Sequence, residues 1–252
     1  MSLFAIADTH LSFAQPKPMD IFGSRWNGFE NRIKDVWNLT VGPGDTVVMP
    51  GDISWSSDFA GLKPDFDFLA TLNGKKIIGK GNHDYWWQTR KKLDEFVAAQ
   101  GYTCFDFLHN NAVFAEGFVI AGSRGWYTGD KPTPAVRGAD NVKLLAREVE
   151  RIKTSLTAAK AIAAEHEEHG AKPEILAFLH FPAVFRGYVC DEIILELYRA
   201  GVERCFYGHI HGVYDEPPST EYHGIRFSLI SADYLDFRPL TINETTHKQE
   251  RV

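Results

Sequence analysis

The sequence has few cysteines, no long apolar run and no cluster of basic residues. Its 252 residues include three cysteines, which lie far apart without a CxxC spacing. This odd, sparse count disfavours a disulfide framework and favours buried, reduced thiols in a reducing, cytoplasmic compartment. No apolar run approaches the roughly 20 residues of a membrane-spanning helix, so we expect no membrane partner. Residues 1–7 predict a buried strand rather than a secretory signal, because they lack a basic start and a cleavage site.

Positive charge is also in the minority. The chain has 33 acidic and 27 basic residues, which gives a formal net charge of -6. Nucleic-acid phosphates favour clusters of Lys and Arg, so we do not expect nucleic acid as a partner. If some aspartates bind metal ions, the metal-loaded protein carries less negative charge than this formal value. The composition, 44% hydrophobic and 24% charged, is typical of a folded globular protein.

Short apolar runs alternate with longer helical patterns along the chain. Strands are predicted at residues 3–7, 46–49, 76–78, 175–179, 205–207, 225–230 and 240–242, with a hairpin at 113–121. The longest helix is predicted from apolar residues spaced by three and four between Val142 and Ala163. No internal repeat and no linker divides the chain. We therefore predict one α/β domain over residues 1–242, with two sheets and helices outside them, and a loose polar tail at 243–252.

Polar side chains of three types follow five of these strands. In chain order they are Asp8 and His10, Asp52, Asn82, His180, and finally His209 and His211. In α/β sheets, ligands bind at the carboxyl ends of the strands, so the five loops are expected to meet at one edge.

Seven Asp, Asn and His side chains predict a particular metal chemistry. Their nitrogen and oxygen atoms suit Mn, Fe, Zn, Ni or Co. Seven ligands are too many for one catalytic ion, which must keep open positions, and they fit two ions that share one carboxylate. Residues i and i+2 of an extended segment face the same way, so Asp8 and His10 are expected to turn toward one cluster. Glycines precede several ligands, where the backbone must turn sharply or approach closely: Gly51, Gly81 and Gly208.

The motif series resembles a known enzyme family. Asp-x-His, Gly-Asp, Gly-Asn-His-Asp, His and Gly-His-x-His occur in this order between Asp8 and His211, as in the calcineurin-like metallophosphoesterases. The resemblance implies a four-layer α/β/β/α sandwich and two divalent ions, with a metal-activated water that attacks phosphorus. It implies a first metal held by Asp8, His10, Asp52 and His211. It implies a second metal held by Asp52, Asn82, His180 and His209. His83 matches the family histidine that contacts the phosphate and protonates the leaving oxygen.

The sequence departs from the family pattern at Trp55. Many relatives carry at this position a second acid that orients the catalytic histidine. Asp84, our second candidate catalytic residue, or Asp58 could replace that acid, or a backbone carbonyl could orient His83. The segment also lacks the acid-Arg-Gly ending of the serine/threonine protein phosphatases, which disfavours that branch.

Two further residues are candidates for contact with the substrate. Trp86 lies in Tyr85-Trp86-Trp87, which either walls a substrate pocket or packs on the core. Arg124 follows a predicted strand, where its guanidinium either binds a phosphate oxygen or forms a surface ion pair.

Three hypotheses for function follow. The first is a metal-dependent phosphoester hydrolase that acts on a small-molecule phosphomonoester or phosphodiester, including a cyclic nucleotide. The second is a nuclease, which would need a basic, aromatic-lined groove. The third is a non-catalytic metal-binding scaffold, whose signature would be the loss of a ligand; every expected ligand is present. The choice of substrate depends on the loops at 11–26, 123–138 and 182–190.

Overall fold

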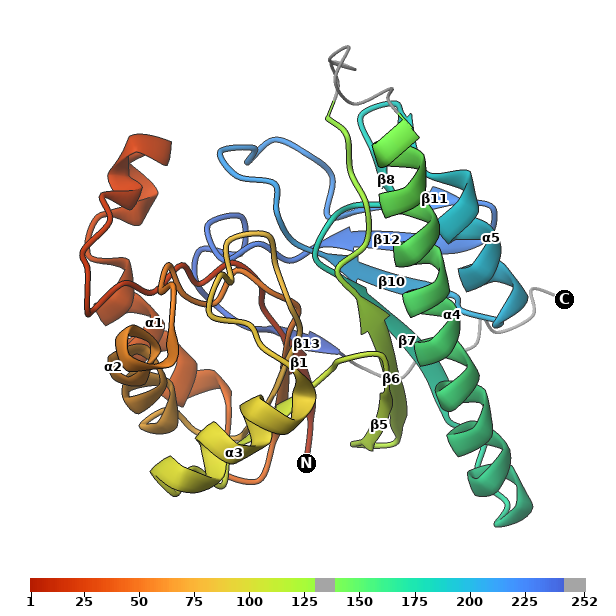
Figure 1. Cartoon of the computed structure of the whole chain (residues 1–252), viewed down its shortest axis with the longest axis horizontal. Helices are drawn as coiled ribbons and strands as arrows, with labels where there is room; N and C mark the ends of the chain where they lie inside the picture. Colours follow the sequence, from red (N-terminus) through yellow and green to blue (C-terminus); the bar gives the residue numbers. More distant parts are fainter. Residues whose placement is uncertain (130–138, 243–252) are drawn as a thin grey trace, which may run out of the picture.

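Two sheets lie between two groups of helices in the computed structural model, which describes residues 1–129 and 139–242 (Figure 1). The tail predicted at 243–252 and most of the loop at 123–138 lie outside the described residues. The tail therefore stays a prediction.

The first sheet has five strands in the order β13-β1-β2-β3-β4. Its strands β1 to β4 run parallel, and β13 pairs with β1 antiparallel. Their bounds are β1 Leu3–Ala5, β2 Thr46–Met49, β3 Lys75–Ile78, β4 Phe105–Phe107 and β13 Leu240–Ile242.

The second sheet has six strands in the order β11-β12-β10-β7-β6-β5. The four inner strands run parallel, and the edge strands β11 and β5 are antiparallel to their neighbours. Their bounds are β5 Ala112–Ala115, β6 Phe118–Ser123, β7 Glu174–Leu179, β10 Arg204–Tyr207, β11 Ser219–Tyr222 and β12 Ile225–Leu229. A small separate hairpin pairs β8, Val184–Phe185, with β9, Tyr188–Val189.

Alternation along the strands produces the layers. In β2, Val47 and Met49 belong to the core beneath the first group of helices, while Val48 packs between the sheets. In β7, Leu176 packs between the sheets and Ala177 faces the second group of helices. Each sheet is therefore apolar on both faces, because one face packs against helices and the other against the second sheet. The α/β/β/α sandwich predicted from the sequence is confirmed, as one domain.

The helices cover the outer faces. Figure 1 shows α1, α2 and α3 on one side and α4 and α5 on the other. Their bounds are α1 Phe29–Thr40, α2 Phe59–Ala70, α3 Arg90–Gln100, α4 Ala139–Glu168 and α5 Asp191–Arg199, and the short 3-10 helices η1, Met19–Phe22, and η2, Ser24–Trp26, precede α1. Asp58 caps α2 by accepting a hydrogen bond from the Gly61 amide at 2.8 Å. None of the helices in the described part of the chain is long and apolar enough to cross a membrane.

Candidate metal centre

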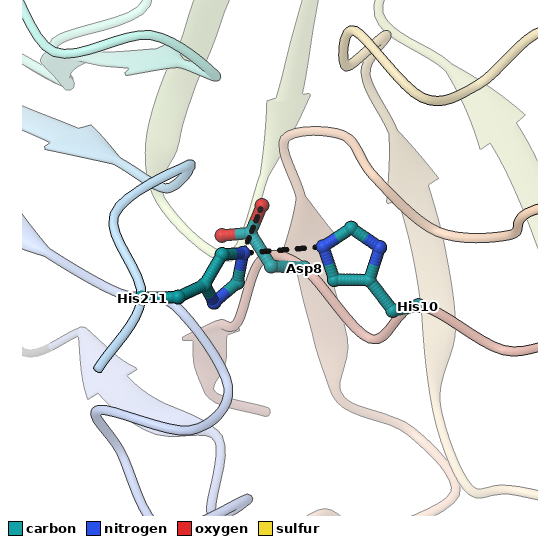
Figure 2. Close-up of side chains that lie close together, drawn as sticks. All are labelled: Asp8, His10 and His211. Atoms are coloured by element: carbon teal, nitrogen blue, oxygen red, sulfur yellow. Dashed lines mark hydrogen bonds and ion pairs between the residues drawn. The ribbon is translucent and has the colours of Figure 1, made fainter. Parts of the chain in front are cut away.

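The loops after five parallel strands bring the predicted ligands together. Asp8, His10 and His211 form a first cluster, whose ligand atoms all lie within 4.8 Å of one another. Figure 2 shows their side chains pointing toward one another, with 3.1 Å between the Nε2 atoms of His10 and His211. Asp52, His180 and His209 form a second cluster by the same criterion.

Asp52 belongs to the second cluster and also borders the first. Its Oδ2 atom is 3.7 Å from His10 Nε2 in the first cluster and 3.5 Å from His180 Nε2 in the second. Asn82 joins the second cluster, because its Oδ1 lies 2.6 Å from His180 Nε2. The clusters are contiguous on the other side as well, since Asp8 Oδ1 is 3.6 Å from His180 Nδ1.

The aspartates of the two clusters, Asp8 and Asp52, each have one oxygen in hydrogen bonds and one without them. Asp8 Oδ2 accepts bonds from the His209 amide and the Ser231 hydroxyl, both at 2.8 Å. Asp52 Oδ1 accepts a bond from the His83 amide at 2.7 Å. The other oxygens, Asp8 Oδ1 and Asp52 Oδ2, are buried without a hydrogen-bond partner among the described residues. An unpaired buried acceptor costs about 1–3 kcal/mol, and a cation would remove this cost. The residues present therefore fit a pair of metal ions.

Burial favours the uncharged form of both the aspartates and the histidines. It raises the pKa of Asp8 to about 6 and raises that of Asp52 well above its usual value. Burial also lowers the pKa of His209 to about 4 and that of His180 well below its usual value. Neutral imidazoles are the form that binds metals, and divalent cations would restore the charged form of the carboxylates.

The backbone at the ligands is strained. Asp8, His10, Asp52 and His209 have φ angles of 60°, 46°, 51° and 70°. Residues other than glycine rarely adopt this left-handed region, and such strain gathers at functional sites. The extended backbone expected for Asp8 and His10 was therefore wrong. The two side chains share a cluster with both residues at positive φ.

Two of the predicted glycines allow this packing. A Cβ on Gly81 would lie 2.0 Å from Asp52 Oδ1, and a Cβ on Gly208 would lie 2.3 Å from Asp8 Oδ2. Any other residue would displace a carboxylate from its hydrogen bonds. The close backbone approach predicted before the ligands is confirmed at both positions.

Comparison with known proteins gives the family. A family model described as calcineurin-like phosphoesterase matches residues 1–213. The chain belongs to this family. It is a hydrolase that acts on ester bonds. Its membership of the family and its two Asp/His clusters support metal-dependent hydrolysis of phosphoesters.

Three solved structures share the fold of this calcineurin-like phosphoesterase. A protein of unknown function from Aquifex aeolicus is 17% identical, with a TM-score of 0.50, over 95% of both chains. A phosphopantetheinyl hydrolase from Mycobacterium tuberculosis is 14% identical, with a TM-score of 0.51, over 98% of both chains. The protein TT1561 of Thermus thermophilus is 10% identical, with a TM-score of 0.50, over 96% of this chain and 97% of the other. The search of curated proteins found no match.

One residue of this phosphoesterase centre was missed in the sequence. Asp233 is buried and accepts hydrogen bonds from His211 Nδ1 and the Gly212 amide, both at 2.9 Å. Burial acts to lower the pKa of His211, but the bond to Asp233 and the charges of Asp8 and Asp233 raise it overall. Such a carboxylate orients a metal-binding imidazole. Asp233 follows β12 as the predicted ligands follow their strands, so the same signal could have found it.

The surroundings of His83 differ from those expected. The carboxylate of Asp84 is occupied by donors other than this ring: the amides of Gly81, Asp52, Ile53 and Ser54 and the indole of Trp86. Asp58 caps α2. Within the described residues, neither acid contacts the His83 ring. The ring packs on Trp55, with 4.2 Å between centroids, and its Nδ1 lies 3.4 Å from the Tyr85 hydroxyl. Its Nε2 is 4.0 Å from Asp52 Oδ2.

The two substrate candidates have different positions. Trp86 is completely buried and packs against Phe66 and Trp87. Of its two predicted places, the core is confirmed and the wall of a substrate pocket was wrong. The apolar indole is more stable in the core, where Asp84 accepts its N–H. Arg124 is partly exposed, with its Nη2 atom 4.0 Å from Glu148 Oε2.

Proposed function

We propose that this chain hydrolyses a small-molecule phosphomonoester or phosphodiester at a two-metal centre. Asp8, His10, Asp52 and His211 would hold one ion, and Asp52, Asn82, His180 and His209 would hold the other. The observation that carries the proposal is the free Oδ2 of Asp52, which is buried between the two clusters without a hydrogen-bond partner among the described residues.

The metal ions and the protein would contribute different parts of the reaction. When bound, two divalent ions supply an activated water nucleophile and Lewis acidity toward the phosphoryl oxygens. The protein holds the ligands rigidly, because Asp8 and Asp52 are each fixed by hydrogen bonds at their other oxygen. His83 is not needed as a ligand. Its ring is about one-third exposed and faces Asp52 Oδ2, a position suited to donating a proton from Nε2 to the leaving oxygen.

The ligand types, the net charge and the cysteines indicate which metals, substrate and location are expected. Asp, Asn and His favour Mn, Fe, Zn, Ni or Co. The net charge of -6 favours a small substrate over nucleic acid. The free cysteines include the buried Cys190 and Cys205, which supports a reducing, cytoplasmic location.

Metal content and hydrolysis test the proposal together. The purified protein is expected to bind about two transition-metal ions per chain, measured by elemental analysis after dialysis against each metal. It is then assayed on aryl phosphates, cyclic nucleotides and nucleic acid with Mn, Ni, Zn and Mg. A reproducible content near one ion would contradict the shared carboxylate, and hydrolysis of nucleic acid alone would favour a nuclease.

Variants of one ligand identify the residue that both ions share. Asp52→Ala is expected to lower metal content and activity more than His10→Ala, because it leaves two cations without their common anion. Asp52→Asn keeps an oxygen for the His83 amide and isolates the loss of charge. Asp236→Asn changes an exposed carboxylate and serves as the control. Equal metal content and activity in the Asp52 and His10 variants would show that Asp52 is not shared.

A further inference from the structure

A basic cavity lies beside the metal centre, one strand further along each sheet. In the first sheet β4 follows β3, and in the second sheet β6 follows β7. Lys80 comes after β3, His109 after β4 and Arg124 after β6. Glu148 and Arg151 reach the same cavity from α4, which packs along β6 (Figure 1).

The cavity has room for a small anion. Its volume is about 80 Å³, and Trp87 and Leu108 form its apolar wall. By the same measure a single water needs about 10–15 Å³. A tetrahedral group of a few heavy atoms, such as phosphate, therefore fits where a larger group would not.

Positive charge in the cavity exceeds negative charge. Lys80, Arg124 and Arg151 face one buried carboxylate, Glu148. Glu148 Oε2 accepts a bond from Arg151 Nη1 at 2.9 Å, and Arg124 Nη2 stays 4.0 Å away. Burial, followed by the charges of Arg151 and Lys80, lowers the pKa of His109, so its ring adds no charge at neutral pH.

Two of the cations have unused donors. The half-buried ammonium of Lys80 has no hydrogen bond or ion pair within the described part of the chain. Arg124 Nε is buried and lacks a hydrogen-bond partner among the same residues. A buried donor without a partner, such as Arg124 Nε, is rare in folded proteins, and Arg124 lines the same cavity as Lys80.

The cavity is joined to the metal centre through the backbone. The carbonyl of Arg124 accepts hydrogen bonds from the amides of His180 and Phe181, at 3.1 and 2.7 Å. Lys80 precedes Asn82 by two residues. Neighbouring strands lie about 4.8 Å apart, so the cavity and the metal centre are separated by about one strand spacing along both sheets.

We propose that this cavity binds a second phosphate group of the substrate while the scissile ester lies at the metal centre. The preferred substrates are then small molecules that carry two phosphate groups. This inference rests on the proposed function and adds a substrate class to it.

A matched pair of substrates tests the inference. The metal-loaded protein is assayed for phosphate release from propyl phosphate and from propane-1,3-diol bisphosphate, with two- to five-carbon diols to find the best spacing. We expect the bisphosphates to have the higher kcat/KM. Lys80→Met is expected to raise KM for the bisphosphate by about 10–100-fold, because it removes one charged hydrogen-bond donor, and to change KM for propyl phosphate less than twofold.

Three controls separate the outcomes. Lys80→Arg keeps the charge and should retain the preference, while Lys92→Met removes an exposed lysine of α3 and should change neither substrate. Equal kcat/KM for the two substrates, unaltered by Lys80→Met, would overturn the second phosphate site alone. No hydrolysis of either substrate, or of the aryl phosphates and cyclic nucleotides of the first test, would overturn the proposed function as well. If inorganic sulfate changes the rate on propyl phosphate in the wild type but not in Lys80→Met, and bisphosphates are not preferred, the cavity binds a free anion and the substrate proposal is wrong.

Discussion

At the residue scale, the centre depends on carboxylates whose two oxygens have different surroundings. Asp8 and Asp52 each have one oxygen fixed by neighbouring donors and one free oxygen directed at histidine nitrogens. Fixing the first oxygen removes the rotational freedom of the side chain before any ligand arrives. The free oxygen then needs no rearrangement to bind a cation, which makes the site preorganised.

Asp233 is predicted to act on the metal through His211. Asp233→Asn is expected to weaken metal binding by about 10–100-fold, because the amide cannot accept both from His211 and from Gly212 as the carboxylate does. Activity should recover largely at saturating metal, since Asp233 is not itself a ligand. The measurement is metal affinity by competition with a chelating dye. Tyr214→Phe is the control, because it removes only the longer 3.3 Å bond to Asp233. Unchanged affinity in Asp233→Asn would mean that His211 needs no such support.

His83 is predicted to act as an acid toward the leaving group. An alkoxide needs a proton to depart and a nitrophenolate does not, and general acid assistance is typically worth ~10²–10⁴ in rate. His83→Asn should keep both metals and lose far more activity on an alkyl ester than on a nitrophenyl ester. The two rates and the metal content are measured on the same preparation. Metal loss would identify His83 as a ligand, and an equal loss on both esters would limit it to binding phosphate.

At the element scale, the first sheet contains one buried charged side chain among apolar neighbours. Lys76 of β3 is fully buried, and its ammonium donates to the Leu72 carbonyl. Burial lowers its pKa from 10.5 to about 8. The strand thus carries a cation that costs stability at neutral pH, on the order of 3 kcal/mol for a shift of this size.

Stability is therefore predicted to depend on pH through Lys76. Below pH 8 the ammonium is charged in both states and the cost is complete. Between pH 8 and 10.5 the unfolded chain binds more protons than the folded one, so the free energy of unfolding rises with pH through this group. Lys76→Met should be the more stable protein at pH 7, and its advantage should shrink by pH 10. Urea unfolding of both proteins at each pH measures the difference, in which other titrating groups cancel. A difference that is constant with pH would contradict the prediction.

The elements also show what the sequence could predict. The strands that precede the ligands were predictable because each is an apolar run buried on both faces, as β2 is. The edge strands β4 and β11 were missed, because Asp106 interrupts the apolar residues of β4 and β11 lacks an apolar run. The position of Asp233 after β12 was readable from the sequence, but its bond to His211 and the left-handed backbone at Asp8 depend on the folded structure and have no local pattern.

At the scale of the whole molecule, metal binding is predicted to stabilise the fold. Each ion that binds only the native state adds about 2.7 kcal/mol when free metal is 100 times its Kd. For a chain of this size, 1 kcal/mol raises Tm by about 2–4 °C. Loading one site should thus raise Tm by about 5–11 °C over the chelated protein, and Asp52→Ala should lose most of this rise. Thermal unfolding with and without chelator measures it, and identical curves would argue against bound metal.

The ligands are far apart along the chain, and this has a consequence for folding. Asp8 and His211 share one cluster although they come from opposite ends of the described chain, and the second cluster joins Asp52 with His209. Closing such long loops is slow, so we expect the centre to assemble after both sheets have formed and docked. Interactions absent from the folding transition state change the unfolding rate and leave the folding rate unaltered. Bound metal ions are therefore expected to slow unfolding and so lengthen the lifetime of the native protein, while the rate of folding stays the same.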